Sequence, residues 1–198
     1  MSSLDRREWT VDAIPFHGEA ITLIRRWHYS GSAPNTSTYR HGIYEASLLR
    51  SSPYGVALWI PPTRSAGEAL TGDGWRGVLS LSRLVVDPVM PANAASFLLG
   101  RSMRLIDRSR WPVLVTYADT AQGHTGAIYH ATNWECDGPV PAGDVWVDAN
   151  GHLCGRKRGK VTLTVEQMRA AGCERRPALP KIRFVHRFTR HLAATTAA

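Results

Sequence analysis

The sequence predicts an α/β fold in which a mixed, mainly antiparallel central sheet is flanked by helices. Three observations lead to this prediction. Several short runs alternate apolar and polar residues or are continuously apolar, which is typical of strands. Longer segments repeat apolar residues at the three- and four-residue spacing of a helix. From residue 42 onward the predicted order is strand, strand, strand, helix, strand, helix and strand, as expected for one mixed sheet.

The predicted elements are defined by their residue ranges. Before the first helix only Val11 and Ile14 form a pattern, which predicts a first strand or an extended lead-in. The predicted helices are residues 18–27, about 94–109, 127–134 and 164–171. The predicted strands are residues 42–49, 54–60, 78–86, 113–115, 134–140, a pair within 144–154, and 182–188. Residues 61–75, rich in glycine, proline, serine and threonine, are predicted as a loop.

Two local signals apply to the C-terminal part of the chain. Thr164 stands three residues before Gln167, and such a pair predicts a capping box at the start of a helix. Asn150-Gly151 separates two apolar runs, and this dipeptide is typical of a tight turn between strands.

The composition indicates a single folded domain, residues 1–198, with a basic C-terminal portion at 151–198. Hydrophobic residues make up 43% of the chain, with seven tryptophans, which is too apolar for a disordered protein. No apolar run approaches the roughly 20 residues of a membrane span, and the N-terminus lacks the apolar core of a secretory signal. The three cysteines form no CxxC pair, so they indicate neither a disulfide framework nor a zinc knuckle. We expect a cytoplasmic protein.

Positive charge is concentrated near the C-terminus. Residues 1–150 carry 13 arginines, no lysine and 14 acidic residues, whereas residues 151–198 carry 11 basic and two acidic residues. A polyanionic partner would explain this excess, and so would a solvated basic face. The candidate nucleic-acid-binding residues lie in a basic turn and in a basic, aromatic last strand: Arg156, Lys157, Arg158, Lys160, Lys181 and Arg183, with Arg187 and Arg190 nearby.

Residues 113–134 hold the main candidates for chemistry. A covered strand ends at Asp119, and a turn containing Gly123 and Gly126 leads into a helix carrying Tyr129. Acidic residues at strand ends beside a helix start are common in the active sites of α/β proteins. Asp119 is therefore a candidate general base or anchor for an amino group. The alternative is that it only caps the helix that follows.

Three further residues are candidates for the same site. His28 and Tyr29 end the first predicted helix. A histidine titrates near neutrality, so His28 could relay a proton or bind a metal, and Tyr29 could stack on a base, as could Tyr39 or Tyr44. Arg83 alternates with apolar residues in the 78–86 strand and is expected to point inward, where it needs Asp119 or an anionic ligand as a partner.

The chain contains several short motifs. No single motif is specific, but their order and spacing together are. The motifs are His28-Tyr29-Ser30, Leu81-Ser82-Arg83-Leu84, Pro91-Ala92-Asn93-Ala94-Ala95-Ser96, Tyr117-Ala118-Asp119, Gly123-His124-Thr125-Gly126, Tyr129 through Trp134, and Lys181-Ile182-Arg183-Phe184. On these motifs the chain resembles the phage Mom family of DNA-modification proteins, within the GNAT-like acyltransferase superfamily. The resemblance covers roughly residues 20–190.

The resemblance implies a GNAT-like fold and a role for the helix after Asp119. Tyr129 would take the place of the tyrosine that protonates the leaving group in related acyltransferases. Asn133 would stand in the usual glycine position and Trp134 in that of the usual phenylalanine. The alternative for Tyr129 is a core tyrosine with only its hydroxyl at the surface.

The donor-binding segment departs from the general GNAT pattern. GNAT enzymes usually cradle the diphosphate of coenzyme A in a glycine-rich loop before a helix, but residues 87–96 contain no glycine. The backbone amides of Asn93, Ala94, Ala95 and Ser96 could still bind a phosphate, or Asn93 could only cap the helix. The donor is therefore left open between acetyl-CoA and an aminoacyl-tRNA.

His124 is a further candidate on the cofactor side of the site. With His28, His41 and Asp119 it could contribute to a metal site, although the sequence contains no HExxH motif and no local pair of ligands at metal-binding spacing. The presence of a bound metal is left open.

The leading hypothesis is an enzyme that modifies the exocyclic amino group of adenine in double-stranded DNA. The resemblance implies transfer of a carbamoylmethyl-type or acyl group, protection of phage DNA from host restriction, and a phage protein acting in the bacterial cytoplasm. One alternative is an acyl-CoA-dependent N-acetyltransferase of a protein or small amine. Another is a non-catalytic DNA-binding protein with a degenerate GNAT fold.

Overall fold

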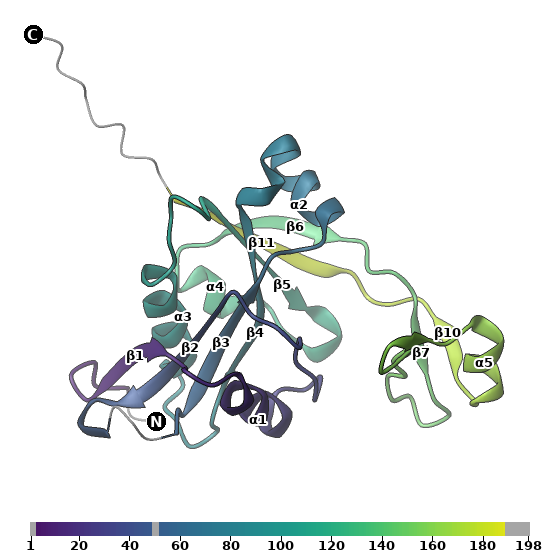
Figure 1. Cartoon of the computed structure of the whole chain (residues 1–198), viewed down its shortest axis with the longest axis horizontal. Coiled ribbons are helices and arrows are strands. Elements are labelled where there is room, and N and C mark those ends of the chain that lie inside the picture. The colour runs from purple at the N-terminus through teal and green to yellow at the C-terminus, as the bar shows by residue number, and fades with distance from the viewer. Residues whose placement is uncertain (1–2, 49–51, 189–198) are drawn as a thin grey trace, which may run out of the picture. The chain divides into compact units, whose positions relative to one another are not determined.

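The main sheet of the computed structural model has seven strands in the order β1-β2-β3-β4-β5-β11-β6 (Figure 1). The structure describes residues 3–48 and 52–188. The strands are β1 (Trp9–Ala13), β2 (Tyr39–Glu45), β3 (Gly55–Ile60), β4 (Val78–Val86), β5 (Val113–Asp119), β6 (Glu135–Val140) and β11 (Lys181–Arg187). Strands β1 to β4 pair antiparallel, and β4 pairs parallel with β5. The predicted fold class, α/β with a mixed, mainly antiparallel sheet flanked by helices, is confirmed.

Helices and two small sheets complete the described structure. The α-helices are α1 (His17–Trp27), α2 (Arg64–Thr71), α3 (Ala94–Arg104), α4 (Ala127–His130) and α5 (Val165–Ala170), and the 3₁₀ helices are η1 (Ala46–Leu48), η2 (Gly72–Gly77) and η3 (Thr120–Gln122). The small sheets pair β7 (Val145–Val147) with β10 (Glu174–Arg176), and β8 (Lys157–Arg158) with β9 (Val161–Thr162). Within residues 3–48 and 52–188, no helix has both the length and the apolar character that a bilayer span requires.

The chain divides into two compact units. Unit 1 comprises residues 1–116, 126–136 and 184–198, and unit 2 comprises residues 117–125 and 137–183. Strands β5, β6 and β11 each contribute residues to both units. The assignment of residues 1–198 to one domain stays a prediction.

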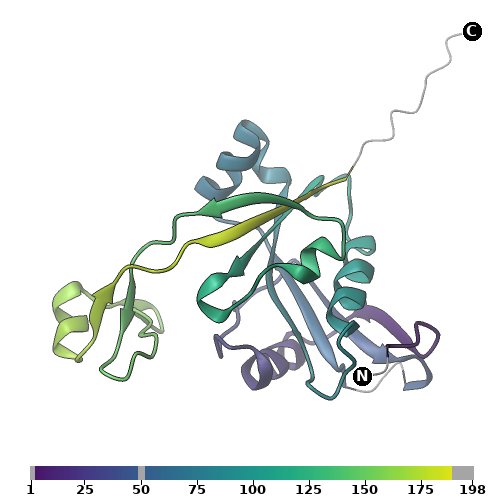
Figure 2. The ribbon, with the colours of Figure 1, turned by 180° about the vertical axis from the view of Figure 1, so that it is seen from behind.

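Helices α1 and α3 cover opposite faces of the antiparallel strands in unit 1 (Figures 1 and 2). Ala20 and Ile24 of α1 pack against Leu58 of β3, together with Ile14, Tyr44 and Val56. The next residue of β3, Trp59, donates a hydrogen bond to Ser102 of α3. Neighbouring strand residues point to opposite faces, so the two helices must lie on different sides of the sheet.

The α3 face contains a buried polar network. Trp59 Nε1 donates to Ser102 Oγ at 2.8 Å, and Ser102 Oγ lies 2.7 Å from His41 Nδ1. The indole nitrogen can only donate, so Ser102 Oγ accepts from Trp59 and can give its own proton to His41 Nδ1. Burial lowers the pKa of His41 to about 4, although Asp12 opposes this shift. His41 is therefore neutral in the folded protein at physiological pH.

Several predicted boundaries were wrong. Residues 64–71, predicted as loop, form α2, whose N-terminus is capped by the Thr63 side chain. Helix α3 ends at Arg104 instead of Ser109, because the Asp107 carboxylate accepts hydrogen bonds from the amides of Ser109 and Arg110 and so favours a turn. Strand β2 starts at Tyr39 rather than Gly42, and Leu49, the predicted end of that strand, lies outside the described residues.

Unit 2 contains the predicted capping box and the predicted turn, but the pair of strands predicted within residues 144–154 was wrong. There β7 pairs with β10 (Figure 2), and only an isolated bridge joins Val147 to Leu153. The complete capping box of Thr164 and Gln167 starts α5. The Asn150-Gly151 turn follows Asp148, whose carboxylate accepts from the amides of Asn150 and His152.

Unit 2 also contains a contact that the sequence did not predict. Cys173 and Cys154 come together in a small core with Trp146 and Met168, and their sulfur atoms lie 2.6 Å apart. Hydrogen bonding with Cys173 raises the pKa of the Cys154 thiol to about 11. Both cysteines are free in the described structure, with no disulfide between them, and their spacing of 19 residues gave no indication of the contact.

The His41 network predicts acid sensitivity. Above pH 6.5 the histidine is neutral in folded and unfolded chains, so its full contribution to stability is present. As the pH falls from about 6.5 to about 4, the unfolded chain binds a proton that the folded one excludes, and stability falls by about 3 kcal/mol in total. Urea unfolding at several pH values should show a shallower acid decline for His41→Gln. Proton NMR of the native protein should show a His41 ring that does not titrate at pH 5 to 6, and a midpoint near 6.5 would contradict the prediction.

Candidate functional site

The parallel pair β4–β5 is short and lies beside an irregularity in β4. Only Val78–Ser80 pair with Val113–Val115, although β4 continues to Val86. Leu58 and Trp59 of β3 pair with Arg83 and Leu81, so Ser82 is an extra residue in β4. Such bulges re-aim side chains and are frequent near active sites. The bulge also interrupts the strict alternation from which the orientation of Arg83 was predicted.

Tyr129 lies in α4 and contacts the strand that precedes it. Thr116 Oγ1 of β5 lies 3.3 Å from the Tyr129 hydroxyl and 3.4 Å from the Leu81 carbonyl, so its single proton can be donated to either. The Tyr129 ring packs on Phe184 and Trp134, with centroids 5.0 and 5.9 Å away. Burial raises the pKa of Tyr129, and the Thr116 hydrogen bond only partly opposes this. The phenol is therefore protonated at neutral pH and can act as a proton donor.

The backbone on both sides of α4 is left-handed. Gly126, the N-cap, has φ +83°, and any Cβ there would collide with the Phe184 ring. Asn133 has φ +60°, which makes it the only non-glycine residue with positive φ in the described chain. Asparagine tolerates this conformation better than most residues. Asn133 thus meets the backbone requirement of the glycine position that the resemblance assigned to it. The helix ends at His130, shorter than predicted.

His28 and Tyr29 form a stacked pair at the end of α1. Their ring centroids lie 4.4 Å apart at an interplanar angle of 28°. The Ser30 amide donates to His28 Nδ1 at 3.2 Å, so a neutral His28 carries its proton on Nε2. Tyr29 is 47% exposed, which leaves part of its ring accessible. Tyr44, by contrast, is buried at 4% exposure and is not available to stack on a base.

Arg83 is half-buried, with carbonyl oxygens as partners. Its Nε donates to the Ser32 carbonyl at 2.8 Å and its Nη1 to the Ser82 carbonyl at 2.7 Å. Burial lowers the pKa of Arg83, and the nearby Tyr29 opposes this. Within the described part of the chain, no carboxylate forms an ion pair with Arg83. The cationic charge beside Tyr29 is therefore suited to an anionic group of a ligand.

The start of α3 differs from a simple capped helix. The Asn93 side chain accepts from the Leu4 amide at 2.9 Å and donates to Ser3 Oγ at 3.1 Å, and it makes no capping hydrogen bond. The Ala94 amide donates to the Pro91 carbonyl. The alternative that Asn93 only caps the helix is thus wrong. A phosphate site at the amides of Ala95 and Ser96 stays a prediction, and residues 87–96 contain no glycine loop of the kind that forms a diphosphate cradle.

Asp119 lies in unit 2, at the end of β5. Its side chain is 14% exposed, accepts from the Ala121 amide at 3.2 Å as the cap of η3, and pairs with Lys181 Nζ at 3.2 Å. The capping role that was considered as the alternative for Asp119 is thus present, together with an ion pair to Lys181. The His124 amide donates to the Asp119 carbonyl, which places both residues in one turn. Convergence of Asp119 and Tyr129 on one cleft stays a prediction.

The predicted nucleic-acid-binding residues of unit 2 differ in their surroundings. Arg156 donates to the Leu163 carbonyl and Arg158 to the Gly155 carbonyl. Lys181 pairs with Asp119, and Arg183 pairs with Asp137. Exposed cations remain at Lys157 and Lys160, and Arg190 lies outside the described residues. Four of the six predicted residues thus make contacts within the unit, and two of these contacts are ion pairs.

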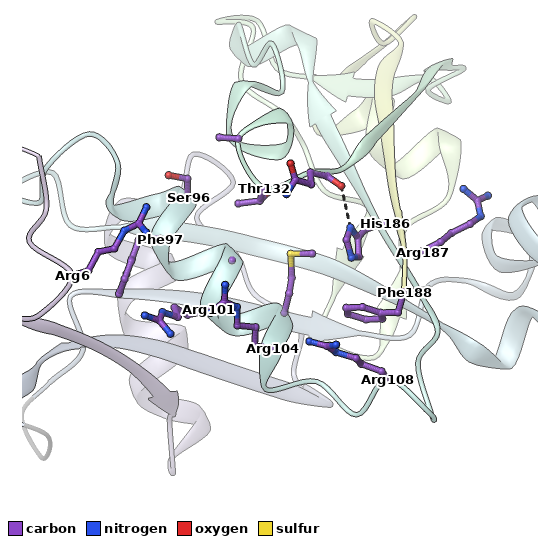
Figure 3. A pocket seen from close by; sticks show the side chains of 14 residues that line it. Arg6, Ser96, Phe97, Arg101, Arg104, Arg108, Thr132, His186, Arg187 and Phe188 are labelled. Carbon is purple, nitrogen blue, oxygen red and sulfur yellow. Dashed lines mark hydrogen bonds between the residues drawn. The ribbon is translucent and has the colours of Figure 1, made fainter. Parts of the chain in front are cut away.

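A cluster of arginines in unit 1 was not proposed as a site from the sequence. A cavity of ≈ 510 Å³ runs along α3 and the residues after α4 (Figure 3). We call it the α3 groove. Five arginines line it: Arg6, Arg101, Arg104, Arg108 and Arg187. In the sequence, Arg101, Arg104 and Arg108 recur at helical spacing, which was the signal for this cluster. The net charge of residues 1–150 conceals the cluster because acidic residues elsewhere in that range balance it.

The structure gives no support to a metal site. Among the residues it describes, no group of three or more histidine, cysteine, aspartate or glutamate side chains is arranged to hold an ion. His41, one of the four residues considered, is buried in hydrogen-bond contact with Ser102. His28 is held by Ser30.

Gly126→Ala should strongly destabilise the protein. The substitution combines a left-handed backbone, which costs an alanine about 1–2 kcal/mol, with a collision against Phe184. Gly123→Ala is the matched control, because Gly123 also has positive φ but has open space around a Cβ. Urea unfolding should show a larger loss for Gly126→Ala. Equal losses would mean that the packing of α4 on Phe184 is not tight.

The fold is similar to that of solved acetyltransferases. A putative acetyltransferase from Salmonella typhimurium, solved with acetyl-CoA, has 11% identity and a TM-score of 0.55, covering 96% of this chain and 99% of that one. A GCN5-related N-acetyltransferase from Kribbella flavida has 11% identity and a TM-score of 0.54 over 93% and 100%. The ribosomal-protein-S18-alanine N-acetyltransferase of Escherichia coli has 9% identity and a TM-score of 0.51 over 96% and 99%. At these identities the likeness shows the fold alone.

Sequence comparison identifies the family. No curated protein matches the chain. The model of the Mom protein family matches residues 8–162, a range that includes Asp119, Tyr129 and Asn133. This match covers more than half of the chain and agrees with the motifs and the GNAT-like fold. The chain therefore belongs to the Mom protein family.

Proposed function

We propose that this protein is an enzyme that transfers a carbamoylmethyl-type or acyl group to the exocyclic amino group of adenine in double-stranded DNA. Membership of the Mom family supports the target, and the GNAT-like fold supports group transfer. The proposed role is protection of phage DNA from host restriction. The single observation that carries the chemistry is the half-buried, protonated Tyr129 phenol in contact with Thr116.

Tyr129 is suited to act as the general acid. Its pKa is raised by burial, so nearly every molecule holds the phenolic proton at neutral pH. A positioned acid of this kind contributes about 10²–10⁴-fold to rate. Packing against Phe184 and Trp134 holds the ring in place. In the proposed reaction Tyr129 gives its proton to the leaving group of the donor.

The acceptor amine needs help of two kinds. Its lone pair is delocalised into the purine, and the base must leave the helix stack at a cost of a few kcal/mol. The exposed Tyr29 ring, stacked on His28, offers a surface on which an extruded adenine can stack. Arg83 beside it can hold the phosphate of that nucleotide. Asp119 would then accept the proton that the amine releases.

The donor would be held at the start of α3. The amides of Ala95 and Ser96 are the candidate contacts for one of its phosphates. The donor supplies the transferred group when bound, and it is either acetyl-CoA or an aminoacyl-tRNA. The acetyl-CoA in the Salmonella typhimurium structure favours the first, and the missing glycine loop favours the second.

Tyr129→Phe should abolish most of the modification while the protein still folds. The phenylalanine ring keeps the packing on Phe184 and Trp134, so only the proton donor is lost. Nucleosides from plasmid DNA co-expressed with each variant are to be analysed by mass spectrometry, with an expected fall of about 10²-fold or more in modified adenine. Tyr54→Phe, a tyrosine packed on Trp9 in unit 1, should retain wild-type levels.

Two results would contradict the proposal. Unmodified adenine in DNA from cells that contain folded wild-type protein would overturn the DNA target. Transfer from acetyl-CoA to a small amine would then favour the N-acetyltransferase alternative. Full modification by Tyr129→Phe would remove the phenol from the mechanism but leave the target intact.

Asp119→Asn should likewise reduce modified adenine by about 10²-fold or more, because the amide cannot accept the proton of the amine. Asparagine can still accept from the Ala121 amide, so the cap of η3 is retained. Asp137→Asn is the control, since it removes a different ion-paired carboxylate of unit 2. Wild-type levels of product from Asp119→Asn would leave that carboxylate with its capping and ion-pair roles only.

A further inference from the structure

We propose that the α3 groove binds the sugar-phosphate backbone of the DNA substrate. The partner depends on the proposed function, because only that function names DNA. The groove itself rests on the arrangement of charge and rings in unit 1. Basic residues near the C-terminus were the sequence candidates for this contact, and the groove is a different surface.

Charge in the groove is not compensated within the protein. Arg187 pairs with Glu135 at 3.4 Å. No carboxylate in the described ranges forms an ion pair with the other four arginines, Arg6, Arg101, Arg104 and Arg108. The acid next to Arg108 in sequence, Asp107, is engaged by Ser109 and Arg110. Four uncompensated arginines along one cavity make a strongly positive surface that attracts a polyanion.

Aromatic rings orient two of these arginines. The Arg101 guanidinium lies over Phe97, 5.5 Å from the ring centroid, and that of Arg108 lies over Phe188 at 5.0 Å. Stacking on a ring face leaves the N–H groups of a guanidinium available for phosphate oxygens. Figure 3 shows the arginines spread along the groove, from Arg6 at one end to Arg108 at the other. This arrangement suits a row of phosphates more than a single one.

His186 adds a contact of a different kind. It lines the groove, and its Nδ1 lies 3.1 Å from the Asn133 carbonyl, so Nδ1 carries the proton and a neutral ring presents Nε2 as an acceptor. Asn133, with its left-handed backbone, lies three residues after the end of α4. The groove is thus attached to the helix that carries Tyr129.

An extended polymer fits the groove better than a small donor. Small-molecule sites are mostly apolar and enclose 70–90% of the ligand. Here the four uncompensated arginines are exposed, so a bound molecule would remain open to solvent along its length. Arginine side chains that reach phosphates without enclosing them are typical of backbone contacts to DNA, which position the duplex without reading sequence.

The test is DNA binding without any donor, so that chemistry is not required. Fluorescence anisotropy with a labelled duplex should give an affinity that falls with salt, with a log–log slope of about −0.9 for each phosphate neutralised. The double variant Arg101→Ala/Arg104→Ala should bind roughly tenfold or more weakly, with a slope shallower by about 2. The single variants Arg104→Gln and Arg108→Gln repeat the test with smaller changes should the double variant not fold.

Arg76→Ala is the matched control. Arg76 is an exposed arginine of unit 1 stacked on Trp75 at 4.7 Å, outside the groove, and its loss changes the net charge as much as either single groove variant does. It should leave the affinity and the salt slope nearly unchanged. An equal loss in Arg76→Ala and the groove variants would overturn the groove as a specific contact.

Three further results separate this inference from the proposed chemistry. DNA binding that depends on the groove, in a protein that yields no modified adenine, would support the groove and refute the chemistry. Modified adenine, together with unchanged DNA affinity in the groove variants, would support the chemistry and refute the groove. Titration with coenzyme A gives the third: weaker coenzyme binding by the groove variants, with unchanged DNA binding, would assign the groove to the donor and overturn the inference.

Discussion

The side chain of Trp59 is the contact on which unit 1 depends most. It is fully buried on β3, donates to Ser102 of α3, and stacks over Trp134, just after α4, at 6.4 Å. One side chain thus holds α3 and the end of α4 on the same face of the sheet. The α3 groove lies between these two segments. Their separation is set by indole packing, because an aromatic ring of this size cannot be compressed or replaced without a cavity.

The same packing explains how a phenol can be both buried and useful. Phe184 fills the space left by the missing side chain at Gly126, and its ring forms one wall around Tyr129. Burial raises the phenol pKa, while Thr116 keeps a polar contact at its oxygen. A tyrosine in this position is protonated and oriented before any substrate arrives, which is what a general acid requires.

The distribution of charge along the sequence differs from its distribution in the folded protein. The net charge of the first 150 residues is close to zero, yet α3 and the N-terminal segment bring uncompensated arginines together. The strongly basic C-terminal portion, in contrast, folds with Arg183 against Asp137 and Lys181 against Asp119. Acidic residues from before position 150 supply these partners. A count along the chain cannot show this, because ion pairs form between residues that are distant in sequence.

Contacts between residues close in sequence decided what the sequence by itself determined: most of the strand and helix order, although α2 was missed, and the Thr164–Gln167 capping box. Each depends on periodicity or on contacts within a few residues. The bulge at Ser82, the thiol contact of Cys154 and Cys173, and the arginine groove came only from the tertiary structure. They depend on which distant segments meet when the core packs, and no local pattern of residues specifies those meetings.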